Sequence, residues 1–210
     1  MESIDTKANK EEFIALLNRA GREGTEYLIE DLEGLGFFEA PASSHFHLAV
    51  PGGLVQHSLN TCHAGLMLRE QVLKMKPDLE PLLREDSIIV ATLLHDVCKA
   101  DIYRPTVKRR RDAQGIFHDE KTYDVTYKNF PMGHGEKSAI VVLRSGFDIH
   151  DDEMLAIRWH MTAWDLAFQN AEAKNCINTA RNKYPLCSLV NLADGIAANL
   201  LEWTYNEELF

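Results

Sequence analysis

A histidine and an aspartate stand side by side, as His95-Asp96, in the otherwise apolar run Ala91–Lys99. Such a run suits a buried helix, and two titratable side chains within it carry a desolvation cost unless something satisfies them. A metal ion is the simplest partner for both. Other side chains of matching chemistry lie in apolar surroundings elsewhere in the chain: His57, His134, His160 and Asp194.

Each of these side chains also has an ordinary interpretation, because a lone histidine on an apolar helix face is usually a satisfied core residue. Asp194 is harder to explain in that way, since an unpaired buried carboxylate is energetically unfavourable. The argument therefore depends on the joint occurrence of the set along the chain. Mixed imidazole and carboxylate ligands suit Mn, Fe, Zn, Ni or Co, and the ligand types do not choose among these metals.

Three further side chains could meet a phosphate. Lys99 lies three residues after Asp96, so one helical turn places both on one face. Its ammonium could neutralise charge on a bound phosphate, or it could only close the helix C-terminus, where the macrodipole favours a cation. Arg158 could reach a phosphate or form a surface ion pair. His47 lies on a loop that could border the pocket.

Helical periodicity dominates the elements that must position these residues. We expect helices over about 10–20, 23–33, 54–74, 87–99 and 134–143, a short one ending at 160, and a last one over about 185–203. The helix over 87–99, capped by Asp86, is apolar nearly all round and should lie at the centre of a bundle. Alternation of aromatic and polar residues predicts a β-hairpin inserted at about 103–130. The predicted fold class is all-α with this small hairpin.

Length and composition predict one domain over 1–210, because 210 residues with 45% hydrophobic content can bury a substantial core. Residues 1–51 would form a helical extension packed on a metal-binding core at 52–200. The net charge of −10 argues against extended nucleic acid or an anionic membrane as partner. The basic run Lys108–Arg111 is the exception, and it could be a local phosphate contact or a solvated strand or turn. A homo-oligomer stays possible.

The expected location is the cytoplasm. The N-terminus lacks a basic region followed by an apolar core, and no apolar run is long enough to span a bilayer. The four cysteines show no CxxC pairing, and Cys62 and Cys98 fall in apolar helical stretches, as reduced cysteines do.

With these residues in view, the chain resembles the HD superfamily of metal-dependent phosphohydrolases. The matching segments are Gly52–Ser58, Leu94–Lys99, Gly133–Ser138, Ile157–Met161 and Leu192–Asp194. The opening Gly-Gly-Leu-x-x-His is most similar to the branch that contains bacterial 3′–5′ exoribonucleases and related nucleotide hydrolases. The resemblance implies an all-helical HD-domain bundle.

The resemblance also implies a role for each residue. A first metal would be held by His57, His95, Asp96 and Asp194, and a second by Asp96, His134 and His160. Asp96 would bridge the two ions and would be catalytic together with Lys99. Two cations about 3.5–4 Å apart bind phosphoryl oxygens and acidify a bound water. The implied activity is hydrolysis of a phosphate mono- or diester by metal-activated hydroxide, with a nucleotide or short oligonucleotide as substrate. Arg158 and His47 are the candidate substrate contacts from their positions in the sequence.

Two features leave alternatives open. Cys98 stands where many relatives have Gly, and a Cβ there is costly if the backbone needs a positive φ. The residues before Gly52 are too few and too helical for the OB barrel of a nucleic-acid-binding domain, so a small phosphorylated substrate is expected.

The same ligand set would also serve a mixed-valent diiron oxygenase of the HD type, similar to myo-inositol oxygenase, or a catalytically silent nucleotide-binding regulator.

Overall fold

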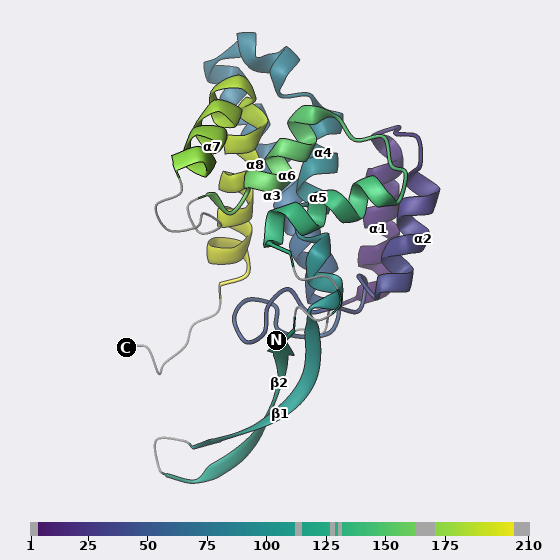
Figure 1. Cartoon of the computed structure of the whole chain (residues 1–210), viewed down its shortest axis with the longest axis vertical. Helices are drawn as coiled ribbons and strands as arrows, with labels where there is room; N and C mark the ends of the chain where they lie inside the picture. Colours follow the sequence, from purple (N-terminus) through teal and green to yellow (C-terminus); the bar gives the residue numbers. More distant parts are fainter. Residues whose placement is uncertain (1–3, 112–114, 127–128, 130–131, 163–170, 204–210) are drawn as a thin grey trace.

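The computed structural model describes residues 4–111, 115–126, 129, 132–162 and 171–203. These residues form a mostly helical bundle from which a two-stranded hairpin projects (Figure 1). The α-helices are α1 (Thr6–Arg19), α2 (Thr25–Leu35), α3 (Gly53–Met75), α4 (Glu85–Leu94), α5 (His134–Arg144), α6 (Asp151–Trp159), α7 (Ala171–Lys183) and α8 (Pro185–Ile196). The 3₁₀ helices η1 (Pro77–Leu82) and η2 (Val97–Asp101) flank α4, and the π-helical turn η4 (Ala197–Leu201) follows α8. The predicted all-α fold with an inserted hairpin is confirmed.

Helix α4 lies at the centre of the bundle, as its composition predicts, and every residue from Ser87 to Leu94 is buried. It packs against α1, α3, α6 and α8. The prediction that this helix continues to Lys99 is wrong. It ends at Leu94, Asp96 takes φ −115° and ψ 14°, and the chain continues as η2. Arg84 precedes the first turn, and Asp86 lies within that turn instead of capping it.

The N-terminal helices pack on the helices that carry the candidate ligands. Phe13 of α1 and Leu28 of α2 belong to one hydrophobic cluster with Leu54 of α3 and Leu93 of α4. Phe37, which follows α2, packs its ring 5.1 Å from that of Phe13. The N-terminal helices and the helices that carry the candidate ligands therefore share one continuous core.

The hairpin consists of β1 (Tyr103–Arg111) and β2 (Phe117–Val125), paired antiparallel so that Arg111 lies opposite Phe117. Nearly all of its side chains are exposed or half-exposed, and the exception is Thr122, whose Oγ1 donates to the carbonyl oxygen of Ser44 at 2.9 Å. The base of the hairpin therefore rests on the loop before α3. Within the predicted hairpin segment 103–130, residues 112–114, 127–128 and 130 lie outside the described residues.

The basic run at the far end of β1 is engaged within the hairpin. Lys108 pairs with Asp124 at 2.8 Å and Arg110 pairs with Glu120 at 2.5 Å. The guanidinium of Arg109 lies 5.1 Å from the centre of the Phe117 ring. Of the two interpretations of this run, these contacts favour a solvated strand.

Candidate metal centre

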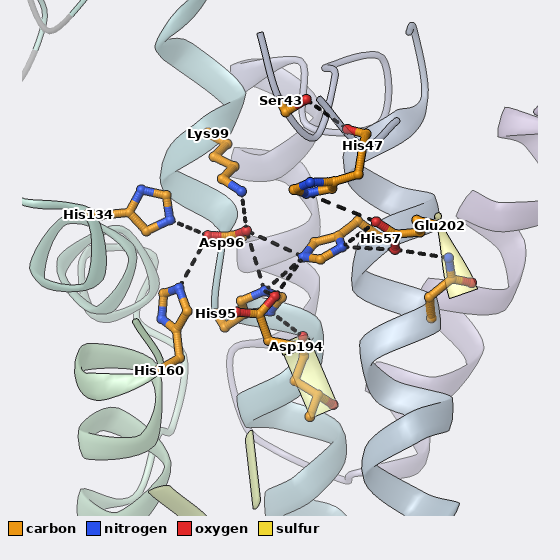
Figure 2. Close-up of polar contacts among 12 residues, drawn as sticks. Ser43, His47, His57, His95, Asp96, Lys99, His134, His160, Asp194 and Glu202 are labelled. Carbon is orange, nitrogen blue, oxygen red and sulfur yellow. Dashed lines mark hydrogen bonds and ion pairs between the residues drawn. The ribbon is translucent and has the colours of Figure 1, made fainter. Parts of the chain in front are cut away.

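Six predicted ligands from five parts of the chain meet around the carboxylate of Asp96, whose side chain is 3% exposed (Figure 2). His57 comes from α3, His95 and Asp96 from the end of α4, His134 from the first position of α5, His160 from the end of α6, and Asp194 from α8. Each segment alone gives one or two donors, and the packing of the bundle brings them together.

The two oxygens of Asp96 face different groups of histidines. Oδ2 lies 3.5 Å from Nε2 of His57 and 3.3 Å from Nε2 of His95. Oδ1 contacts Nε2 of His134 and lies 3.5 Å from Nε2 of His160. The second carboxylate belongs to the first group, because Oδ1 of Asp194 lies 3.3 Å from Nε2 of His57. Asp96 thus stands between two sets of donors.

The backbone fixes the tautomers of two of these histidines. His95 and His160 are the residues that cap the C-termini of α4 and α6. Their Nδ1 atoms lie 2.7 Å from the carbonyl oxygens of Thr92 and Ile157, respectively, each three residues earlier. A carbonyl only accepts a hydrogen bond, so Nδ1 carries the proton in both rings, and the lone pair of Nε2 is left to face Asp96.

The arrangement of these lone pairs requires a cation. Nε2 of His57 and Nε2 of His95 lie 3.2 Å apart. Nδ1 of His57 donates to a carboxylate, so both facing nitrogens are acceptors unless a proton or a metal ion sits between them. Nε2 of His160 is buried and has no hydrogen-bond partner among the described residues. The donors therefore fit a divalent transition metal.

The charges of the cluster also suit the binding of a metal ion. Burial raises the pKa of Asp96, but the neighbouring Lys99 and the histidines lower it well below its ordinary value, so the carboxylate is ionised. Burial lowers the pKa of His57, yet its hydrogen bonds with two carboxylates, Asp194 and Glu202, raise it to about 9. In the absence of metal, His57 therefore holds the proton that a metal ion would replace.

Lys99 reaches the carboxylate from the 3₁₀ helix η2. Its Nζ lies 2.6 Å from Oδ2 of Asp96, and its backbone N–H donates to the Asp96 carbonyl oxygen at 2.9 Å. The predicted one-turn spacing holds, although in a 3₁₀ turn. Cys98 needs no positive φ, because Leu48 and Thr162 are the described non-glycine residues that have one. The Cys at this position therefore carries no backbone penalty.

A cavity of about 270 Å³ opens beside Asp96 and Lys99. Its other lining residues are His47, His160, Met161, Asn191, Asp194, Gly195, Ala198 and Asn199. Nε2 of His47 is buried without a hydrogen-bond partner among the described residues, and burial is the main factor that lowers its pKa to about 4. The next residue, Leu48, has a left-handed backbone (φ 45°), a strained conformation that surrounding structure must impose.

Arg158 is not among the described residues that line this cavity. Its guanidinium pairs with Glu136 and lies 3.9 Å from the centre of the Trp159 ring. The surface ion pair, which is the alternative interpretation of Arg158 from its sequence, is the arrangement found.

Two residues near the centre were not predicted from the sequence. Asn191 donates from Nδ2 to the carbonyl oxygen of His160 at 2.7 Å and thereby ties α8 to the end of α6. Glu202 binds His57, although it lies beyond the last matching motif. The signal available for Glu202 was a single acidic residue in the apolar stretch Leu200–Trp203.

Comparison with known proteins defines the class. The family model of the HD domain matches residues 54–199, which is more than half of the chain. The chain therefore belongs to the HD domain family, a family of metal-dependent phosphohydrolases. Searches of curated proteins and of solved structures found no match. Among the described residues, no helix is long and apolar enough to cross a membrane.

Proposed function

We propose that this protein hydrolyses a phosphate mono- or diester of a nucleotide or short oligonucleotide at a two-metal site. The observation that supports this proposal most strongly is that the two oxygens of Asp96 face two different groups of ligands. His57, His95 and Asp194 lie on one side, and His134 and His160 lie on the other. This division supports one ion on each side, with Asp96 as the bridging ligand.

When bound, the two cations would polarise the phosphoryl group and acidify a water molecule. The protein's own contribution is to hold the charges that surround the substrate. Lys99 lines the cavity and lies against Asp96, so its ammonium is placed where negative charge develops on the phosphoryl oxygens. Fixed charges of this kind need no reorganisation during the reaction.

The size of the cavity favours a small substrate. A volume of about 270 Å³ lies just below the range of roughly 300–1,000 Å³ for ordinary ligand pockets, which suits a phosphorylated sugar or a compact nucleotide. We assign His47 as a substrate contact, because its buried Nε2 lines the cavity, makes no hydrogen bond among the described residues and lies 4.0 Å from its charge partner, Oε2 of Glu202. Arg158 would contact a substrate that extends beyond the cavity. Free cysteines, three of them buried, agree with the proposed cytoplasmic location.

The test is hydrolysis by the purified protein loaded separately with Mn²⁺, Fe²⁺, Co²⁺, Ni²⁺ or Zn²⁺. Bis-p-nitrophenyl phosphate and p-nitrophenyl phosphate distinguish diester from monoester activity, and nucleotides, cyclic nucleotides and short oligonucleotides define the substrate. His95→Ala should abolish turnover. Absence of cleavage with every metal, or full activity of His95→Ala, would overturn the proposal. A stable mixed-valent diiron signal after aerobic iron loading would favour oxygenase chemistry instead.

A further inference from the structure

Glu202 is a buried carboxylate outside the region that defines the family. It follows the π-helical turn η4, three residues beyond the matched range 54–199, and it is 7% exposed. A buried carboxylate destabilises the fold unless it is paired. Its partners therefore indicate why this position holds an acid.

Both oxygens of Glu202 are directed at the base of α3. Nδ1 of His57 lies 2.9 Å from Oε1 and 3.0 Å from Oε2. Nδ2 of Asn60, one turn further along α3, donates to Oε1 at 3.0 Å. Asn60 is held in turn by Nε2 of Gln56, which donates to its Oδ1 at 3.0 Å. Glu202 thus has an ordered set of donors centred on His57, and Nε2 of His47 lies further off, 4.0 Å from Oε2 (Figure 2).

The π-helical turn explains how Glu202 reaches this position. Glu202 lies eight residues after Asp194, and in an uninterrupted α-helix it would be rotated about 80° away from it around the helix axis. The backbone N–H of Glu202 donates instead to the carbonyl oxygen of Ala197, five residues earlier, at 2.9 Å. The one extra residue of the π-helical turn reduces the rotation between Asp194 and Glu202 to about 20°, so both of these carboxylates face α3.

His57 is consequently held at both ring nitrogens. Asp194 lies against Nε2 and Glu202 against Nδ1. By contrast, His95 and His160 give their Nδ1 protons to neutral backbone carbonyls. A carboxylate partner fixes the ring and makes the opposite nitrogen a stronger ligand.

On the basis of the proposed two-metal site, we propose that Glu202 is a positioning residue that orients His57 and strengthens it as a metal ligand. Glu202 acts through His57 and does not itself touch the substrate. The π-helical turn η4 is the backbone feature that brings Glu202 to His57.

The decisive variant is Glu202→Gln, which keeps the shape and an acceptor oxygen but removes the charge. Its dissociation constant for Mn²⁺, measured by titration of metal-free protein, should rise about 10–100-fold. Its far-UV circular dichroism should match the parent. Glu70→Gln, at an exposed position of α3, the helix that carries His57, is the matched control and should bind Mn²⁺ like the parent.

Ring ¹H–¹⁵N NMR of the Zn²⁺-loaded protein gives a readout that a general structural role would not move. The Nδ1 proton of His57 should resonate far downfield in the parent and shift upfield in Glu202→Gln, while those of His95 and His160 stay in place. The spectrum of the parent tests the proposal even if the variant does not fold.

An affinity for Mn²⁺ within twofold of the parent in Glu202→Gln would overturn this role. So would a parent spectrum in which His57 lacks an Nδ1 proton, or a parent that binds no metal. A parent that binds metal tightly and hydrolyses no phosphate ester would overturn the proposed function and leave the role of Glu202 standing.

Discussion

Lys99 is the side chain whose role in the chemistry can be separated from metal binding. Its Nζ contacts Asp96 at 2.6 Å, yet an ammonium cannot ligate a cation. Lys99→Met should therefore retain its metal and lose about 10²–10³ in kcat, because a fixed positive charge near the developing phosphoryl charge is removed. Metal content by elemental analysis and turnover of bis-p-nitrophenyl phosphate measure the two effects separately.

Lys76→Met, at an exposed position, is the control for the loss of a lysine and should change neither quantity. If Lys99→Met kept full activity, Lys99 would only close the turn after α4. If it lost metal and activity together, its role would be structural.

Residue types and their order were sufficient to predict the five side chains that gather around Asp96, because few residues ligate metals and each of these lay in an apolar segment. The partners of the second ring nitrogens were beyond prediction. Two of them are carbonyl oxygens of Thr92 and Ile157, which no sequence pattern marks. Glu202 depends on a π-helical turn, and its one extra residue changes which side chains share a helix face.

At the scale of elements, Gly135 controls how closely α5 approaches α6. A Cβ built on Gly135 would overlap the carbonyl oxygen of Arg158. Gly135→Ala should push α5 away from α6 and destabilise the fold by about 1–3 kcal/mol. Since His134 is the adjacent residue, we expect the bound Mn²⁺ to fall from two ions toward one, measured by elemental analysis after gel filtration.

Gly34→Ala is the matched control, because Gly34 lies within α2 and a Cβ there meets nothing within 4 Å. It should stabilise the helix by about 0.5–1 kcal/mol and leave the metal content unchanged. Two tightly bound ions in Gly135→Ala would show that the spacing of α5 and α6 does not govern the second ion.

The elements themselves were largely predictable, and their ends were less so. Periodicity marks α3 and α4 because their apolar faces are long. The end of α4 was predicted five residues too late, since Val97 and Cys98 are as apolar as the helix before them. What ends the helix is the tertiary requirement that Asp96 turn toward histidines from three other helices.

At the scale of the molecule, the hairpin and the bundle are separable. Apart from Thr122, the side chains of the hairpin are exposed or half-exposed, so the bundle gains little apolar burial from the hairpin. Replacing residues 105–123 by a short Gly-Ser turn should change the free energy of unfolding by about 1 kcal/mol, the contribution of the hydrogen bond to Ser44. Denaturant titration and metal content test this, and failure of the bundle to fold would contradict it.

The metal centre should act as a tie across the whole bundle, because its ligands come from α3, α5 and α8 and from the ends of α4 and α6. An ion that binds only the folded state at 100 times its dissociation constant contributes about 2.7 kcal/mol. For a chain of 210 residues, that corresponds to a rise in Tm of about 5–11 °C. Chelation should lower Tm by this amount and Mn²⁺ should restore it.

The shift should shrink in His57→Ala and persist in His63→Ala, an exposed histidine of the same helix that pairs with Glu12. Equal shifts in the two variants would mean that the ion stabilises the protein at some other site.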